Sequence, residues 1–165
     1  EMLIETRAKG GNLLLNVGPK PNGEIPIEQE QRIRELALWL FINREAIYEI
    51  RPWHVTHEEN IWFTKAKDED TVYAIITGIP NWKRGDRKEF TLTSVRATDE
   101  TAIDVLGQSS NLVEYNPSKN AEVRFEKNET GLHISCVRAQ RIYNNHQWPN
   151  PIVLRITNAK PATND

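Results

Sequence analysis

The hydrophobic and polar positions divide the chain into two parts with different periods. In the first part, Leu13–Val17 is a short, mostly apolar run with a Gly-Gly pair before it and a Gly-Pro pair after it. An apolar run of this length between turn residues is typical of a strand that is buried on both faces of a parallel sheet. We therefore predict a central strand at residues 13–17.

A helix is predicted on each side of this strand. Residues 2–8 have the pattern of the last turns of a helix, with Gly10 near the position that closes it. After the strand, Pro26 suits a first helical turn, and Asn43 suits a helix end. The apolar residues of this second helix recur at intervals of three and four and form one face, which we interpret as packing against a sheet: Ile33, Leu36, Ala37, Leu40 and Phe41, with Trp39 at its edge.

A strand followed by a short loop and a helix is one βα unit of a parallel α/β architecture. A single unit cannot cover both faces of its own strand, because the neighbouring strands and helices are missing. We therefore expect the rest of the sheet to be encoded upstream of Glu1, and this chain to be the C-terminal part of a larger protein.

From about residue 52 the pattern changes to short segments with a period of two. Leu132, Ile134 and Cys136, for example, alternate with His133 and Ser135. Strands of this length separated by turn clusters predict an antiparallel sandwich. The predicted strands are residues 61–66, 71–77, 89–95, 102–106, 122–126, 132–137 and 152–157. We divide the chain into residues 1–52, a sandwich domain at 53–160 and a disordered tail at 161–165.

Composition narrows the classes of partner. The 165 residues carry a formal net charge of -2, which gives no field that would attract nucleic acid or an anionic membrane. No apolar run approaches the roughly 20 residues that a membrane-spanning helix needs. The single cysteine, Cys136, lies in a predicted strand and is expected to be a buried, inert thiol.

The sequence contains no motif for catalysis, for a cofactor or for a metal. His54 and His57 have a spacing that a helical metal site could use, but their segment lacks a helical pattern, so we predict no metal. The carboxylates lie in helix faces and turns, where they are expected to be solvated, and no catalytic residue is assigned in this segment. Asn16 interrupts the apolar run near the C-terminal end of the predicted strand, where parallel α/β proteins bind ligands. Its alternative role is a hydrogen bond to loop backbone.

Two tryptophans lie in loops of the sandwich instead of on an alternating strand face. They are Trp82, in a Pro-Asn-Trp sequence, and Trp148, just before Pro149. Exposed aromatic rings of this kind could stack on sugar rings as a substrate-binding surface. They could equally pack their loops onto the sandwich.

Residues 9–53 resemble glycoside hydrolase family 29, the retaining α-L-fucosidases. The resemblance is carried by the strings KGGNLLLNVGP, NGEIP, WL, NREAIY and RPW, in that order. In that family this passage is the last strand and helix of a catalytic (β/α)8-like barrel, and it leads into a C-terminal β-sandwich. One departure is Arg44, which replaces the glycine usual after the helix-ending asparagine.

The resemblance implies a fold and an activity. It implies an α/β barrel fragment followed by an antiparallel all-β sandwich, in an enzyme that hydrolyses terminal α-L-fucosides with retention. The aspartate nucleophile and the acid/base carboxylate are expected upstream, so only Asn16 and the loop after it map to the family's active site, as part of the barrel rim. The implied partners are a fucosylated glycan and the remainder of the barrel, and the implied location is secreted, or periplasmic in a bacterium. An alternative is that the sandwich is a carbohydrate-binding or purely structural accessory domain.

Overall fold

The computed structural model describes residues 1–79, 81–83, 85–108, 118–139 and 150–162. The described residues form two α-helices, α1 (Met2–Ala8) and α2 (Ile27–Asn43), a short 3-10 helix, η1 (Arg44–Ala46), and eight strands. The two α-helices confirm the helices that the sequence predicts at residues 2–8 and from Pro26 to Asn43. Arg44 continues from α2 into η1 with a right-handed helical backbone, so the family's usual glycine is not needed at this turn.

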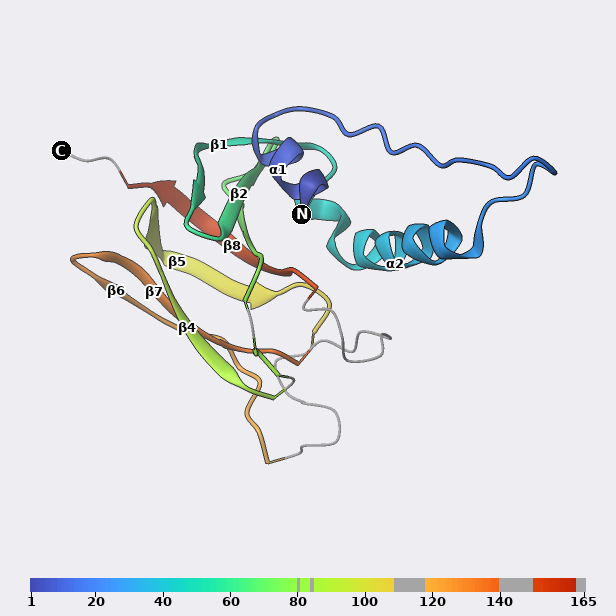
Figure 1. Ribbon diagram of the computed structural model, residues 1–165. Coiled ribbons are helices and arrows are strands. Elements are labelled where there is room, and N and C mark those ends of the chain that lie inside the picture. Colours follow the sequence, from blue (N-terminus) through green and yellow to red (C-terminus); the bar gives the residue numbers. More distant parts are fainter. Residues whose placement is uncertain (80, 84, 109–117, 140–149, 163–165) are drawn as a thin grey trace.

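The strands form two antiparallel sheets that face each other as a sandwich (Figure 1). One sheet has the order β1-β2-β3-β8-β5, and the other has the order β4-β7-β6. All strand pairs in both sheets are antiparallel, which confirms the predicted sandwich. The strands are β1 (Ile50–Glu58), β2 (Ile61–Ala66), β3 (Val72–Ile76), β4 (Arg87–Leu92), β5 (Val95–Val105), β6 (Arg124–Asn128), β7 (Gly131–Val137) and β8 (Ile152–Pro161).

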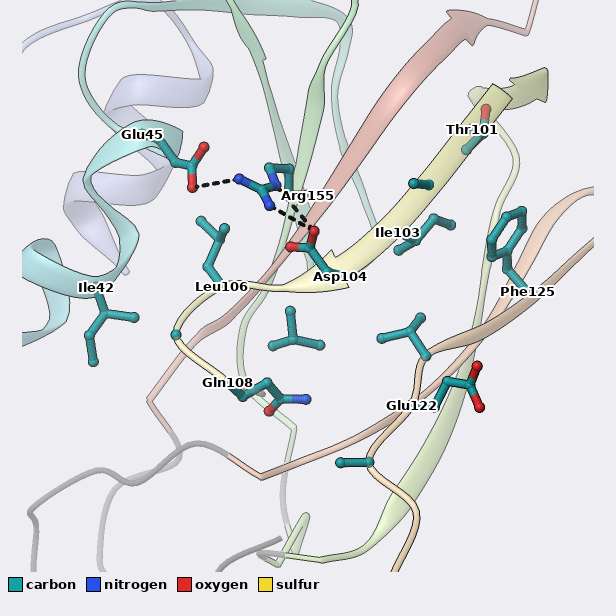
Figure 2. A pocket seen from close by; sticks show the side chains of 15 residues that line it. Ile42, Glu45, Thr101, Ile103, Asp104, Leu106, Gln108, Glu122, Phe125 and Arg155 are labelled. Atoms are coloured by element: carbon teal, nitrogen blue, oxygen red, sulfur yellow. Dashed lines mark hydrogen bonds and ion pairs between the residues drawn. The ribbon is translucent and has the colours of Figure 1, made fainter. Parts of the chain in front are cut away.

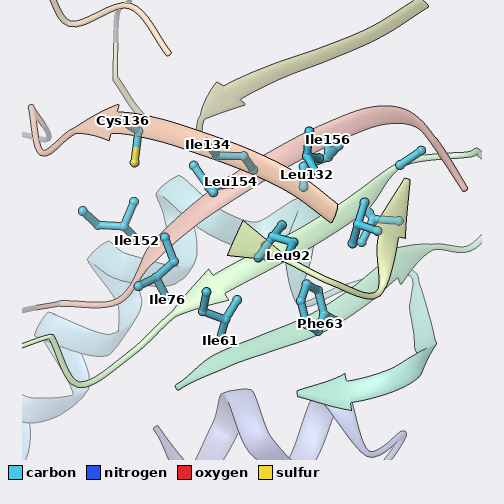
Figure 3. Close-up of a cluster of buried hydrophobic side chains, with 14 of the residues drawn as sticks. Ile61, Phe63, Ile76, Leu92, Leu132, Ile134, Cys136, Ile152, Leu154 and Ile156 are labelled. Atoms are coloured by element: carbon cyan, nitrogen blue, oxygen red, sulfur yellow. The ribbon is translucent and has the colours of Figure 1, made fainter. Parts of the chain in front are cut away.

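The main core lies between the two sheets and follows the alternation of the strands (Figure 3). Along β7, Leu132, Ile134 and Cys136 are buried, whereas His133 and Ser135 are partly exposed, as the period of two predicts. Cys136 is the buried thiol that the sequence predicts, and burial raises its pKa to about 12. The larger sheet contributes apolar side chains that include Phe63, Ile76, Ile152, Leu154 and Ile156.

The outer face of the larger sheet is covered by α1 and by the end of α2. Ile4 and Trp39 belong to a second buried cluster with Tyr73, Ile75 and Val153 of the sheet. Since β3 is covered on both faces, all five of its residues are buried. Hydrophobic burial on two sides therefore joins the helices and the sandwich into one structure.

The strand predicted at Leu13–Val17 is not confirmed, because these residues form neither helix nor strand in the 165-residue chain. They are part of an extended segment, and the side chains of Leu14 and Leu15 are 84% and 58% exposed. Figure 1 shows this segment extending away from the sandwich between α1 and α2. The reason is that a strand needs neighbours to pair with, and the described strands pair within the sandwich.

The apolar face of α2 is also uncovered, against the expectation that it packs on a sheet. Phe41 is 81% exposed, and Ile33 and Ala37 are exposed as well. The buried residues of α2 are Trp39 and Asn43, in its last two turns. Trp39, predicted as the edge of the apolar face, is therefore a main attachment of α2 to the sandwich.

The structure adds details at the predicted domain ends. Strand β1 begins at Ile50, before the predicted division between residues 52 and 53, and its register shifts between Pro52 and His57. Within the predicted tail, Pro161 ends β8 and the Ala162 backbone N–H donates to the Ser94 carbonyl (2.8 Å). Residues 163–165 lie outside the described residues. The division into domains stays a prediction.

Candidate functional site

Asn16, the predicted rim residue, is exposed in the extended segment between α1 and α2. The segment returns to α2 through a polar turn, in which the Lys20 backbone N–H donates to the Glu24 carbonyl (2.7 Å). The Gly18 backbone N–H donates to the Gln29 side chain on α2 (2.9 Å). At its other end, Arg7 donates to the Gly11 carbonyl (2.8 Å) and to the Ile47 carbonyl (3.0 Å). Asn16 is thus carried by a segment that is fixed at both ends and open in the middle.

Trp82 lies in the sandwich core and is 4% exposed. Its indole N–H donates to the Asp86 carbonyl (2.7 Å), and its ring lies 5.5 Å from the ring of Phe90. A ring with both faces covered by protein offers no surface for a sugar, so the structure shows Trp82 in its packing role. The structure does not bring Trp82 and Asn16 together, and Trp148 lies outside the residues that it describes.

A pocket of about 720 Å³ lies along β5, where the sandwich meets the end of α2 (Figure 2). On the side of the helices it is lined by Ile42, Glu45, Asp104 and Arg155. On the side of the smaller sheet it is lined by Ile103, Val123 and Phe125, among others. Its volume is in the range of pockets that bind small ligands.

Arg155 is the centre of a polar network on the helix side of this pocket. Its guanidinium donates to the Asp104 carboxylate (2.8 Å) and to the Glu45 carboxylate (3.5 Å), and the Tyr73 hydroxyl donates to Glu45 (3.1 Å). The hydrogen bond to Asp104 is the main cause that raises the pKa of Arg155. Burial, with the Glu45 charge, raises the pKa of Tyr73, so the phenol stays protonated and remains the donor.

Sequence reasoning missed this network and the pocket beside it. Glu45 and Arg155 are 110 positions apart in the sequence, and Glu45 and Tyr73 are 28 apart. The four residues lie on η1, β3, β5 and β8, and they meet because the three strands pair and η1 packs on the same sheet. No local pattern marks them, because each one is an ordinary residue whose partners in the network are distant in the sequence.

His54 and His57, whose spacing was considered for a metal site, each contact a neighbouring group of the protein. The His54 ring lies within hydrogen-bond distance of the Ser94 carbonyl (3.0 Å), and the His57 ring stacks on Trp62 at 4.8 Å. Across the described part of the chain, no group of three or more His, Cys, Asp or Glu side chains is placed to hold a metal ion. Nor is any described helix long and apolar enough to cross a bilayer.

Together these features define a β-sandwich joined to helices and to an extended segment in which Leu14, Leu15 and Val17 are exposed. Residues 1–45 match the family described as Alpha-L-fucosidase. Plasma α-L-fucosidase of Rattus norvegicus is 32% identical over 136 residues, which are 81% of this chain and 28% of that protein. The α-L-fucosidase of Branchiostoma floridae is 36% identical over 115 residues, 68% of this chain and 24% of that protein. The chain belongs to the α-L-fucosidase family of glycoside hydrolases, and it spans about a quarter of the length of these relatives.

Solved structures agree with the sandwich fold. A Thermotoga maritima α-L-fucosynthase, in complex with a fucosyl disaccharide azide, is 25% identical, with a TM-score of 0.55 over 94% of this chain and 32% of that one. An α-L-fucosidase of Bacteroides thetaiotaomicron is 14% identical, with a TM-score of 0.58 over 95% of this chain and 30% of that one. The second likeness is one of fold alone.

Proposed function

We propose that this chain is the C-terminal part of an α-L-fucosidase that hydrolyses terminal α-L-fucosides with retention of configuration. In this proposal, residues 13–17 pair as the last strand of a (β/α)8-like barrel, and α2 is the helix that follows it. The two catalytic carboxylates belong to the upstream part of the barrel. Secretion, or a periplasmic location in a bacterium, stays a prediction from the family resemblance.

The observation that carries the proposal is where the uncovered apolar residues lie. Leu14, Leu15 and Phe41 are among the exposed large apolar side chains, and all three lie within the family match at residues 1–45. The sandwich begins only a few residues later, with β1 at Ile50. An extended segment and a helix that expose their apolar side chains are what a barrel would cover, because each βα unit of a barrel packs against its neighbours.

Several acidic side chains of the described residues are engaged in ion pairs. Retention needs two carboxyl groups about 5–5.5 Å apart on either side of the scissile bond. Glu5, Glu30 and Glu45 instead form ion pairs with Lys9, Arg34 and Arg155. We therefore assign no catalytic role in this chain, and propose Asn16 as a rim residue whose side-chain amide donates to or accepts from a sugar hydroxyl.

The sandwich supports the barrel in this proposal. The Trp39 indole N–H of α2 donates to the Pro151 carbonyl (2.9 Å). The buried Thr64 hydroxyl of β2 donates to the Ala46 carbonyl of η1 (2.9 Å). With the Tyr73–Glu45–Arg155 network, these bonds fix the end of α2 to the larger sheet. A helix held in this way would keep the last βα unit in place as the barrel closes.

The test compares the 165-residue chain with a longer protein that includes its natural upstream sequence. We expect the chain alone to fold, by circular dichroism, and to release no product from an aryl α-L-fucoside. The longer protein should hydrolyse the same substrate, and nuclear magnetic resonance should show the α-anomer as the first product. Turnover by the chain alone, or a β-anomer as first product, would contradict the proposal.

Asn16 is tested in the longer protein. We expect Asn16→Ala to raise KM several-fold with a smaller change in kcat, because a rim contact contributes mainly to binding. Asn120→Ala, an exposed asparagine of the sandwich, is the matched control. An unchanged KM in the Asn16 variant would remove this residue from the binding site.

A further inference from the structure

The sandwich is open on the side where its two sheets end in β5 and β6. Each of these strands is the last one of its sheet, and both line the pocket of Figure 2. The pocket follows β5 and the next turn from Thr101 to Gln108. At about 3.3 Å per residue, the strand part alone, residues 101–105, gives a length of roughly 16 Å. The site is therefore an elongated trough, suited to a chain-like ligand.

The floor of the trough on the side of β6 is apolar and aromatic. Ile103 and Val123 are partly buried and pack against the main core. Phe125 belongs to β6 and is 38% exposed, and Figure 2 shows its ring beside Ile103. An aromatic ring left open in a concave site offers a flat apolar surface against which the C–H groups of a sugar ring would pack.

Carboxylates dominate the charged groups around the trough. The described lining has three of them, on Glu45, Asp104 and Glu122, and one guanidinium, on Arg155. Arg155 already binds two of these carboxylates, as described above. The excess of carboxylates gives the trough a negative electrostatic potential, which disfavours phosphate, sulfate and other anionic ligands. Carboxylate oxygens can, however, accept hydrogen bonds from the hydroxyl groups of a neutral ligand.

We propose that this trough binds a neutral oligosaccharide, with Phe125 as the stacking surface and Glu122 and Asp104 as acceptors for its hydroxyl groups. The proposal does not depend on the fucosidase activity, since the trough lies within the sandwich and the end of α2. It gives the sandwich a binding function that neither Trp82 nor Asn16 supplies.

Because β5 is an edge strand, an extended peptide could also bind there by pairing with β5 as a further strand. The register of β5 disfavours it. The pairing of β5 with β8 shifts between Ala97 and Ala102, so only residues 102–105 run regularly along the trough. The Gln108 backbone N–H also donates to the Val105 carbonyl (3.3 Å) as the next turn begins. Four residues are shorter than the usual strand and leave few backbone groups for a peptide.

The experiment is saturation-transfer nuclear magnetic resonance and calorimetry on the 165-residue chain, with 2′-fucosyllactose and lactose as neutral probes and 3′-sialyllactose as the anionic one. We expect binding of a neutral probe and at least tenfold weaker binding of the anionic probe. Phe125→Ala should weaken the neutral probe at least tenfold. Tyr48→Ala, which removes a 54% exposed ring outside the trough, should leave binding unchanged.

A second variant, Glu122→Gln, keeps the shape of an exposed side chain and should weaken binding several-fold without affecting folding. Circular dichroism and thermal unfolding would show that each variant is folded. Absence of a signal from both neutral probes with the folded wild-type chain would overturn the proposal. So would equal binding by the folded Phe125 variant, or binding of an alternating Val-Thr hexapeptide in place of either saccharide.

Discussion

The Glu58 carboxylate, near the end of β1, holds the turn between β4 and β5. It accepts hydrogen bonds from the backbone N–H groups of Thr93 (2.8 Å) and Ser94 (2.7 Å). Burial raises the pKa of Glu58, but the hydrogen bonds from Ser94 and Thr93 outweigh it, so the net pKa is lowered. Two bonds from backbone donors to one ionised group therefore connect the first strand of the larger sheet to the start of its last one.

This arrangement predicts a dependence of stability on pH. Because folding lowers the pKa of Glu58, its contribution is present above the unfolded-state pKa of about 4.5 and is lost as the pH falls below that value. We expect Glu58→Gln to lower the free energy of unfolding by about 1 kcal/mol at pH 7. The difference from wild type should shrink towards pH 3, as measured by urea titration at several pH values.

Glu59→Gln is the control, since it removes the same charge from the neighbouring exposed position. It should change the free energy of unfolding little at any pH. If Glu58→Gln and Glu59→Gln had the same small effect, Glu58 would not hold the turn.

At the residue scale, alternation predicts which side chains are buried only where a strand has one covered face. It identified Leu132, Ile134 and Cys136 correctly because β7 lies between two strands over the core. It did not place Trp82, because a loop has no period and the ring is buried through contacts that the chain makes only after folding. The pattern also could not predict the hydrogen bonds of Glu58, because their donors lie 35 and 36 positions away in the sequence.

At the scale of the elements, the turn that follows β5 approaches the end of α2 closely at Gly107. Gly107 has a φ of +73°, and a β-carbon placed there would lie 2.2 Å from the Cγ2 atom of Ile42. A contact this short requires the helix or the turn to move, because Cγ2 is attached directly to the stiff β-carbon of isoleucine. Gly107 is therefore needed both for its backbone conformation and for the close approach of α2.

We predict that Gly107→Ala destabilises the chain by about 2–4 kcal/mol, from roughly 1 kcal/mol for the left-handed backbone and the rest for overpacking. Gly23→Ala is the matched control, since Gly23 has a φ of +84° but nothing within 4 Å of its added β-carbon. Chemical denaturation should show the difference between the two variants. Equal losses in both would mean that Ile42 moves aside without penalty.

Elements with a clean period were predicted closely, and interrupted ones were not. Residues 61–66 were predicted as a strand, and β2 has the same bounds. Strand β1 was missed because Pro52 and a register shift interrupt its pattern. The predicted strand at residues 89–95 joined the end of β4 to the first residue of β5, since the turn at Thr93 and Ser94 contains neither glycine nor proline.

For the whole molecule, the Arg155 network connects the helices to the sandwich. Arg155→Met keeps the apolar stem but removes the bonds to Glu45 and Asp104. We expect faster hydrogen exchange of the backbone amides at residues 47 and 48, which donate within the η1 turn, and a loss of about 1 kcal/mol in stability, because the group is partly exposed.

Lys127→Met is the control for this variant, since Lys127 forms a surface ion pair with Asp99 (2.8 Å) far from the helices. It should leave the exchange at residues 47 and 48 unchanged. Unchanged exchange in the Arg155 variant as well would show that apolar packing alone holds η1 in place.

The proposed barrel predicts that Phe41 behaves differently in two contexts. In the 165-residue chain its ring is 81% exposed, so Phe41→Ala should change the free energy of unfolding by less than about 0.5 kcal/mol. In the longer protein, where the ring would be buried, the same change should lose about 3–5 kcal/mol. Arg34→Ala, on the polar side of α2, should have little effect in both. A small effect of Phe41→Ala in both proteins would contradict the proposed packing.

The sequence therefore predicted the sandwich almost completely, whereas the strand predicted at residues 13–17 does not form among the described residues. The local pattern of apolar residues indicates which secondary structure a segment can form, and the pattern around Leu14 and Leu15 is compatible with a buried strand. A strand forms only when another strand accepts its backbone hydrogen bonds. That is why the same reasoning succeeded for β7 and failed for the apolar run.

Helix α2 is attached to the sandwich near its C-terminal end, through Trp39, so it can act as a lever arm. Its 17 residues give a length of about 25 Å at 1.5 Å per residue, with the buried residues at one end only. A tilt of about 10° at the attached end would therefore move the other end by roughly 4 Å. In the 165-residue chain, small repacking around the Trp39–Pro151 hydrogen bond would therefore be amplified at the turn that leads back to Asn16.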